Sequence, residues 1–311
     1  EMVRVAAESG CAVHISHLKI AGRENWKDAE SLLAIFEEAQ ARGLHITADQ
    51  YPYAAGSTLL SAILPPWAHD GGLEAALSRL RDPRARAAMR EAMTASGSSD
   101  WDNFWSWTGP AGIVIADIPS GRHPGAVGKS LAEAAHRWGK DPIVAAFDLL
   151  RDERLGVAMI SMSQDEPTVE RFLTLPWVCV GSDGLLGGRP HPRAFGSYPR
   201  MLGRYVREKG LLSLEEAIRK MTSQAAMALG FSDCGWVRQG LRANLVVFDP
   251  ETVADRATFE DPLQFPVGIR DVLVGGEAVV RGGEITGARP GRVLRTTATT
   301  KAQRTQRRTR E

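Results

Sequence analysis

The spacing of apolar and polar positions predicts strands alternating with helices in the first part of the chain. After Gly10, "CAVHIS" is a short apolar stretch typical of a strand. The next segment, "ENWKDAESLLAIFEEAQARG", has apolar residues at Ala29, Leu32, Leu33 and Phe36, the i, i+3, i+4, i+7 spacing of a helix. "LHITADQYPY" then predicts a second strand. Strand, helix, strand is the unit of a parallel sheet with outer helices, so we expect a doubly wound sheet or a βα-barrel.

Residues 65–110 interrupt this pattern. They combine a charged helical piece with the aromatic-rich "WDNFWSWTG". We expect an insertion that either packs on the surface or covers a site as a lid. The α/β alternation is then predicted to return with "GIVIADI", "SLAEAAHRWG", "DPIVAAFDLLRDE", "GVAMISM" and "WVCVGSDG".

The pattern changes again near the end of the chain. "SLEEAIRKMTSQAAMALG" begins with Ser213 and Glu216 in capping-box spacing and stops at Gly230, which predicts one helix. Short apolar stretches separated by turn glycines predict a small β unit over residues 231–295. Residues 296–311 have no apolar period, and we expect a disordered basic tail. The barrel-like part is therefore predicted to span residues 1–230.

Composition and charge limit the classes of partner that can be expected. The chain has 311 residues, 43% hydrophobic and 24% charged, with a net charge of +1, which gives no reason to expect nucleic acid or membrane as a partner. No apolar run is long enough to cross a bilayer and no leader is recognisable, so we expect a cytoplasmic protein. Nucleic-acid binding by the basic tail is a competing hypothesis that predicts steep salt dependence. The sequence leaves the oligomeric state open.

The three cysteines do not suggest a metal site. Cys11, Cys179 and Cys234 are widely spaced and form no CxxC pair, which favours reduced structural thiols.

The stretch "HISHLK" raises the question of a metal ligand. Strand alternation places His14 and His17 on opposite faces and His17 on the same face as Lys19, so at most one of the two histidines faces a common site. His17 and Asp183, in "VGSDG", both follow strands, where parallel α/β folds gather their chemistry. One imidazole and one carboxylate fall short of the roughly three protein ligands of a hydrolytic zinc site. Spacing alone therefore leaves a metal enzyme and a structural role equally open.

Six motifs in order carry a resemblance to a known family: "HISHLKIAGRENW", "ADQYPYAAGSTLL", "SQDEP", "VGSDG", "RPHPRAFGSYPRMLGRY" and "GLRANLVVFDPETVADRATF". From about residue 1 to residue 295, the chain closely resembles the N-acyl-D-amino-acid deacylase (D-aminoacylase) branch of the amidohydrolase superfamily. This resemblance implies an α/β fold, a partial TIM-like (βα) barrel of the metal-dependent amidohydrolase type with a small C-terminal β-sandwich segment. It also implies zinc-dependent hydrolysis of the amide bond of N-acyl-D-amino acids, which are small-molecule substrates.

The resemblance implies roles for individual residues. His17 matches a metal-ligating histidine, and Asp183 matches an aspartate that binds near the metal and acts as general base. The implied substrate-binding residues are Lys19, Tyr51, Ser57 and Arg193. Residue chemistry agrees, because an ammonium and a guanidinium suit a carboxylate and a phenol can donate to a developing oxyanion. The alternatives are a surface Lys19, an Arg193 paired with a nearby acid, and a Tyr51 that packs against Pro52.

The sequence also departs from the family. An HxH motif, a ligating cysteine and a further histidine are expected upstream of the segments seen in this chain, and its own cysteines match none of them. We therefore expect a fragment of a longer deacylase that is poorly soluble and inactive when expressed alone. Asn244 stands where the family usually has aspartate.

Two alternatives for function remain. A cyclic-amide hydrolase resembling a hydantoinase is the first, and a catalytically inactive truncated barrel that serves as a scaffold is the second. No residue identifies the preferred D-amino acid, although Trp101, Trp105 and Trp107 are candidates for a wall of the substrate site. The acyl preference and the number of metals are left open as well.

Overall fold

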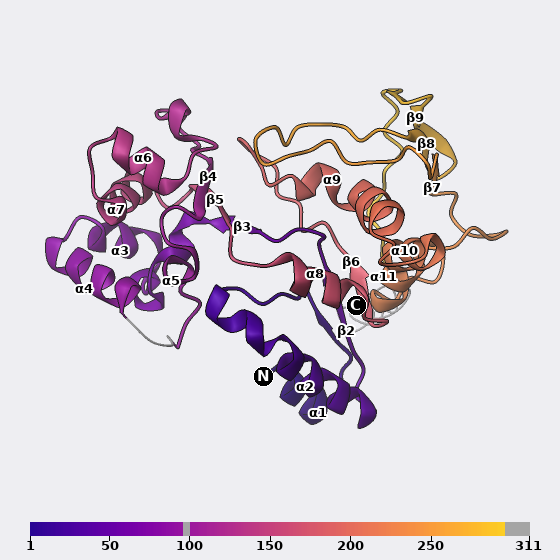
Figure 1. Ribbon diagram of the computed structural model, residues 1–311, viewed down its shortest axis with the longest axis horizontal. Coiled ribbons are helices and arrows are strands. Elements are labelled where there is room, and N and C mark those ends of the chain that lie inside the picture. The colour runs from indigo at the N-terminus through magenta and orange to yellow at the C-terminus, as the bar shows by residue number, and fades with distance from the viewer. Residues whose placement is uncertain (96–99, 296–311) are drawn as a thin grey trace, which may run out of the picture.

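The computed structural model describes residues 1–95 and 100–295 (Figure 1). The predicted disordered tail, residues 296–311, lies outside the described residues.

A three-stranded parallel sheet forms the first structural unit. Its strands are β1 (Val13–Ile15), β2 (Ile46–Gln50) and β6 (Val178–Val180), in the order β1-β2-β6. The predicted strand–helix–strand unit is thus present, with α2 (Ala29–Ala41) between the first two strands. The helices of this unit are α1 (Met2–Ser9), η1 (Arg23–Asp28), α2, α8 (Glu166–Leu173), α9 (Arg193–Arg200), η5 (Met201–Glu208), α10 (Leu214–Met221) and α11 (Ser223–Ala228).

Side-chain alternation in β2 explains how this sheet is covered. Ile46 and Ala48 are buried in one apolar cluster with Leu33 and Phe36 of α2 and Phe172 of α8. The residues between them point to the other face, since successive side chains in a strand alternate. That second face carries the polar residues described below.

Two predicted helices are interrupted. The segment before Ala29 is the 3₁₀ helix η1 rather than α-helix. The second interruption is at Thr222, whose backbone (φ −129°, ψ −87°) separates α10 from α11. Ser213 caps α10 by accepting the Glu216 N–H at 3.2 Å, but the Glu216 carboxylate bonds Arg219 instead of reaching back to Ser213.

A second unit, which we call the insertion lobe, spans residues 56–161. It contains an antiparallel sheet of β3 (Gly56–Leu59), β5 (Ala158–Ser161) and β4 (Ile113–Asp117) in the order β3-β5-β4. Its helices are η2 (Leu60–Ile63), η3 (Pro66–His69), α3 (Gly72–Arg79), α4 (Pro83–Thr94), α5 (Phe104–Thr108), η4 (Pro124–Ala126), α6 (Leu131–Arg137) and α7 (Pro142–Asp152).

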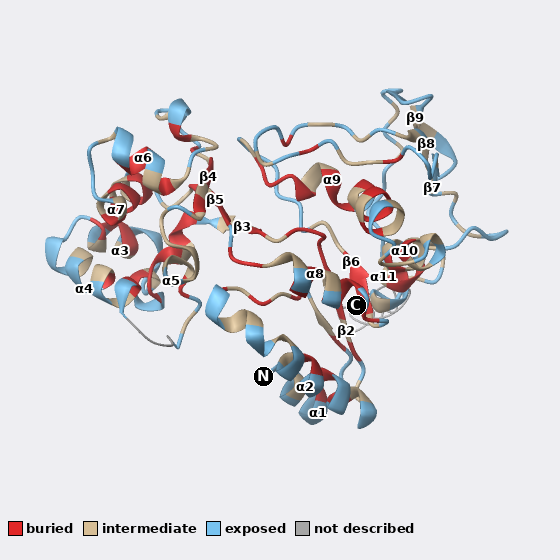
Figure 2. Ribbon diagram, in the orientation of Figure 1, coloured by how far each residue is buried: buried red, intermediate tan, exposed pale blue. Residues whose placement is uncertain are grey.

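The insertion lobe corrects one expectation from the sequence. "GIVIADI" and "GVAMISM" do not continue the parallel sheet, because their strands pair antiparallel to each other and β5 also pairs with β3. An apolar period identifies a strand but not its partner or direction, which depend on tertiary contacts. The lobe has its own apolar core, formed by residues between Leu60 and Met159 (Figure 2). It therefore includes more of the chain than the 65–110 segment that stood out in the sequence.

The third unit is a single antiparallel sheet. Its strands are β7 (Leu245–Phe248), β8 (Ile269–Val274), β9 (Glu277–Arg281) and β10 (Glu284–Ile285), in the order β10-β9-β8-β7. These strands lie within the small β unit that the sequence predicts over residues 231–295. A sandwich needs two facing layers, and the described residues after 231 supply one, leaving Val246 55% and Ile285 68% exposed.

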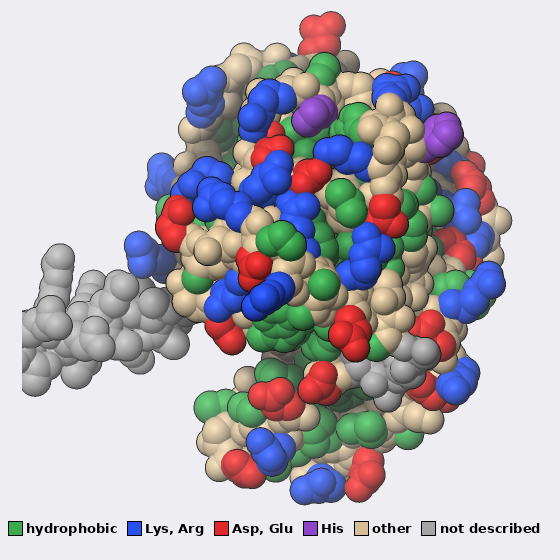
Figure 3. All heavy atoms as spheres, turned by 90° about the vertical axis from the view of Figure 1, so that its left-hand side faces the viewer, with side chains coloured by type: hydrophobic (Ala, Val, Ile, Leu, Met, Phe, Trp, Pro, Cys, Tyr) green, Lys and Arg blue, Asp and Glu red, His purple; other side chains and the backbone are tan. Residues whose placement is uncertain are grey.

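The described part of the chain contains no helix with the length and apolarity needed to cross a membrane. Cys11, Cys179 and Cys234 are free thiols. On the outer face of the insertion lobe, basic and acidic side chains are interspersed (Figure 3).

Candidate functional site

The backbone at His17 sets the geometry of the "HISHLK" segment. β1 ends at Ile15, and His17 then adopts a left-handed conformation with φ 47°. Strand alternation therefore does not determine its direction, although Lys19 does lie beside it. Lys19 Nζ is 2.5 Å from His17 Nδ1 and donates to the His17 carbonyl oxygen at 2.9 Å.

Asp49 on β2 forms hydrogen bonds with this segment. Its Oδ1 accepts the His17 backbone N–H at 2.8 Å and its Oδ2 lies 2.9 Å from His14 Nε2. His14 Nδ1 is in turn 2.8 Å from Thr47 Oγ1. Burial acts to raise the pKa of Asp49, but the hydrogen bonds from His14 and His17 outweigh it and hold that pKa below its usual value. His14 thus helps to fix the position of Asp49, whereas His17 lines the cavity.

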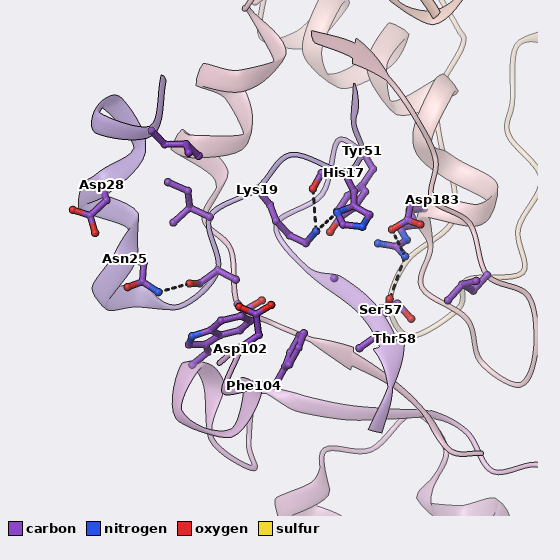
Figure 4. A pocket seen from close by; sticks show the side chains of 18 residues that line it. His17, Lys19, Asn25, Asp28, Tyr51, Ser57, Thr58, Asp102, Phe104 and Asp183 are labelled. Atoms are coloured by element: carbon purple, nitrogen blue, oxygen red, sulfur yellow. Dashed lines mark hydrogen bonds and ion pairs between the residues drawn. The ribbon is translucent and has the colours of Figure 1, made fainter. Parts of the chain in front are cut away.

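A cavity of about 690 Å³ lies between the parallel sheet and the insertion lobe (Figure 4). It receives side chains from the ends of β1, β2 and β6, from η1 and from β3 and α5 of the lobe. Its lining includes His17, Lys19, Asn25, Asp28, Tyr51, Ser57, Thr58, Asp102, Phe104, Trp107, Asp183 and Arg193. All six residues singled out in the sequence therefore meet at one cavity.

Asp183 and Arg193 form an ion pair at one end of the cavity. Asp183 follows β6 with φ 46°, and its Oδ2 is 2.8 Å from Arg193 Nη2. The Arg193 side chain is only 1% exposed; its Cζ lies 4.4 Å from the centre of the Tyr51 ring, and Nη2 donates to the Ser57 carbonyl oxygen at 3.3 Å. The sequence left open that Arg193 pairs with a nearby acid, and in the structure that acid is Asp183.

Lys19 carries the central positive charge. Burial is the largest influence and, together with the charge of Arg193, lowers the pKa of Lys19 to about 8, although Asp183 and, more weakly, Asp102 and Asp49 raise it. At neutral pH the side chain is therefore still an ammonium. It faces the middle of the cavity (Figure 4).

Tyr51 and Ser57 differ in what they can offer a ligand. The Tyr51 hydroxyl accepts a hydrogen bond from Gln164 Nε2 at 3.0 Å, and burial raises the pKa of Tyr51. The phenol therefore keeps its own hydrogen available for donation. Ser57 Oγ instead donates to the Met159 carbonyl oxygen at 3.0 Å, which ties β3 to β5.

Comparison with known proteins identifies the family. Residues 2–280 match the amidohydrolase family along most of the chain. The chain belongs to the amidohydrolase family. It is 36% identical over 296 residues to an N-acyl-D-glutamate deacylase of Alcaligenes xylosoxydans xylosoxydans, covering 95% of this chain and 50% of that protein. It is 35% identical over 299 residues to a D-aminoacylase of the same organism, covering 96% and 51%.

A solved structure agrees with these matches. It is N-acyl-D-glutamate deacylase from Bordetella bronchiseptica, complexed with zinc and a phosphonate inhibitor that mimics the tetrahedral intermediate. The TM-score is 0.73 at 35% identity, over 94% of this chain and 52% of that one. The resemblance to the deacylase branch and the mixed α/β amidohydrolase fold are thereby confirmed. This amidohydrolase chain spans about half the length of the curated relatives it matches.

Two residues of this amidohydrolase suit a zinc site. The His17 imidazole and the Asp183 carboxylate are ligand types that zinc takes, both face the cavity, and no described residue bonds His17 Nε2. Within residues 1–95 and 100–295, however, no group of three or more His, Cys, Asp or Glu side chains is arranged to hold a metal. The two residues therefore fit as part of a ligand set.

Sequence reasoning missed several residues of the site in this amidohydrolase. His191 is buried; its Nε2 lies 3.0 Å from the Ala55 carbonyl oxygen, and its Nδ1 accepts the Arg193 N–H at 3.0 Å. Burial lowers the pKa of His191 to about 3, so the ring is neutral and carries its proton on Nε2. The motifs "SQDEP" and "RPHPR" contain Gln164 and His191, but nothing in their spacing reveals these contacts.

The expected aromatic wall is partly present. Trp107 lines the cavity, while Trp101 and Trp105 pack against the core of the insertion lobe. Phe104 takes a place on the wall that the sequence did not assign to it.

Proposed function

We propose that this amidohydrolase takes part in the zinc-dependent hydrolysis of the amide bond of N-acyl-D-amino acids, giving a D-amino acid and a carboxylate. The observation that carries the proposal is the convergence of His17, Lys19, Tyr51, Asp183 and Arg193, from separate segments, on one cavity. The deacylases to which the chain is similar support the same reaction class.

His17 and Asp183 are the residues of this chain that would hold zinc. Zinc held there would supply a Lewis acid, which would lower the pKa of a water molecule towards about 7 and polarise the scissile carbonyl. The remaining ligands are expected from the family's HxH, cysteine and histidine motifs, which match no segment of this chain.

Asp183 is the proton carrier of the proposed reaction. Its carboxylate accepts the proton of the attacking water and returns it to the nitrogen of the leaving amine. The Arg193 guanidinium, 2.8 Å away, fixes the direction of the carboxylate. His191 fixes Arg193 in turn through the backbone bond to Nδ1.

Lys19, Arg193 and Tyr51 are proposed to bind the substrate. Lys19 presents an ammonium to the α-carboxylate, and Arg193, which lines the same cavity, adds a second cation. The Arg193 Nε is buried and has no partner among the described residues, which suits an incoming anionic group. The Tyr51 hydroxyl can donate to the carbonyl oxygen as negative charge develops there.

As the sequence led us to expect, we propose a cytoplasmic enzyme that acts on small-molecule substrates. The mixed charge on the face seen in Figure 3 supports the absence of a nucleic-acid partner on that face.

The test uses the protein expressed from its complete reading frame and reconstituted with zinc. We expect hydrolysis of N-acetyl-D-amino acids, none of their L-enantiomers, and a loss of at least a hundredfold in kcat/KM for Asp183→Asn. Faster hydrolysis of hydantoins would instead identify a cyclic-amide hydrolase. Full activity in Asp183→Asn would contradict the proposed role of this carboxylate, and absence of turnover on every substrate would favour a scaffold.

A further inference from the structure

We propose that the α5 side of the cavity reads the side chain of the D-amino acid, favouring a cationic side chain and disfavouring an acidic one. This inference rests on the proposed function, because it takes the α-carboxylate to lie at Lys19 and Arg193. It goes further in naming the class of substrate.

The two sides of the cavity differ in charge. Lys19 and Arg193 are the cations of the described lining; Arg193 is paired with Asp183, and Lys19 faces the middle of the cavity (Figure 4). The opposite side is formed by η1 and the α5 segment, and its described lining residues include no lysine or arginine. The Asp28 carboxylate points away from the cavity centre (Figure 4), so Asp102 supplies the negative charge of this side. An anionic α-carboxylate and a cationic side chain on one substrate therefore match the two sides.

Asp102 is free to meet such a side chain. It is exposed at the cavity, and no hydrogen bond or ion pair of its carboxylate occurs among the described residues. Asp102 and Lys19 line the same cavity (Figure 4). An acidic side chain placed here would be repelled, and a guanidinium or ammonium would be attracted.

Aromatic rings complete this wall. Phe104 and Trp107 have ring centroids 4.7 Å apart with planes tilted by 55°, and both line the cavity beside Asp102. Ring faces attract cations, so they add to the effect of the carboxylate. The combination of carboxylate and rings favours arginine-like side chains over neutral aromatic ones, and both over acidic ones.

The wall is anchored on both sides. The buried Asn103 caps α5 by accepting the Ser106 N–H at 3.1 Å and donates to the Met93 carbonyl oxygen of α4 at 3.0 Å. On the other side, Trp107 lies so close to Gly22 that a Cβ there would be 2.7 Å from Trp107 Cδ1. These contacts hold the α5 segment, including Trp107, in place, and Asp102 directly precedes the anchored Asn103.

The experiment compares kcat/KM for N-acetyl-D-arginine, N-acetyl-D-phenylalanine and N-acetyl-D-glutamate with the zinc-loaded protein from its complete reading frame. We expect the order arginine, phenylalanine, glutamate, with at least about a tenfold gap between first and last. Asp102→Lys should lower the arginine-to-glutamate ratio by about tenfold or more. Asp102→Asn, which preserves size, should shift the ratio the same way by less.

Glu91→Lys is the matched control. Glu91 is exposed on α4 of the same lobe and outside the cavity, so this variant changes the net charge equally. We expect it to keep the wild-type ratio. A wild-type preference for glutamate, or a ratio unaffected by both Asp102 variants, would overturn this inference while leaving the deacylase function standing. Absence of hydrolysis of all three substrates would overturn the deacylase function as well.

Discussion

Asp49 is the residue on which the position of His17 depends most. Its carboxylate joins the His17 backbone N–H to the His14 ring. We expect Asp49→Ala to weaken zinc binding by about 10- to 100-fold, because residues that orient a ligand typically contribute that much. Competition with a chromogenic chelator measures this without any turnover.

Thr47→Val provides the control for Asp49. It removes the 2.8 Å contact to His14 Nδ1 and leaves Asp49 in place, so zinc affinity should stay near that of the wild type. An equal loss in both variants would show that the His14 ring, rather than the bond to His17, is what matters.

His191 predicts a pH dependence of stability. Its pKa is about 3 in the folded protein and about 6.5 when unfolded, so between these values the unfolded chain binds the extra proton. Stability is therefore lost as the pH falls from about 6.5 towards 3. The free energy of unfolding, measured by urea denaturation, should change less steeply with pH in His191→Gln. Between pH 4 and 6 we expect its slope to be smaller by about 1 kcal/mol per pH unit.

The exposed His136 on α6 is the comparison for His191. His136→Gln should leave the slope with pH as it is in the wild type. A wild-type slope in His191→Gln would mean that other groups cause the acid sensitivity.

At the residue scale, the sequence identified those site members that stand in recognisable motifs. His17, Lys19 and Asp183 follow strands, and their placement could be expected from the carboxyl ends of a parallel sheet. Asp102 and His191 could not be found in this way, because their importance comes from neighbours far away in the chain. His191, for example, bonds a carbonyl oxygen 136 residues away.

At the scale of elements, the glycine before η1 lies close to Trp107 of α5, which lines the cavity. Gly22 has φ 89° and touches Trp107. We expect Gly22→Ala to destabilise the protein by about 1–3 kcal/mol for its backbone (φ 89°, ψ 127°), which residues other than glycine rarely adopt, and by a further 1–3 kcal/mol, roughly, for the clash. Urea denaturation followed by tryptophan fluorescence measures the change.

Gly43→Ala separates the two effects. Gly43 has φ 83°, but an added Cβ meets nothing within 4 Å. Its substitution should therefore show only the backbone part. Equal losses at both positions would mean that α5 moves away from the new methyl group without resistance.

Apolar periodicity located most of the strands, although not β3, and it did not reveal their pairing. The stretches that became β4 and β5 are as apolar as those of the parallel sheet, yet they join the antiparallel sheet of the insertion lobe. Backbone hydrogen bonds are the same whichever strand supplies them, so a single sequence does not encode the partner locally. The order of β7 to β10 was easier to foresee, because short turns with glycines join β8 to β9 and β9 to β10.

At the scale of the molecule, separate apolar cores lie under the two walls of the cavity. Phe147 is buried in the apolar core of the insertion lobe and Phe172 in the apolar cluster that covers the parallel sheet. We expect each phenylalanine-to-alanine change to cost about 3–5 kcal/mol and to speed hydrogen exchange mainly in its own unit. Exchange that rises equally in both units for either variant would show that they unfold as one.

The left-handed backbone at His17 is expected to lower the thermal stability of the protein, whereas the imidazole is needed for the proposed zinc site. A side chain in that conformation costs about 1 kcal/mol, and the exposed imidazole has little packing to offset it. His17→Gly should therefore melt at a slightly higher temperature than the wild type in a thermal-shift assay, while lacking the imidazole. Laboratory evolution that rewards heat resistance alone would drift towards glycine here, and only a population also screened for turnover would keep the histidine.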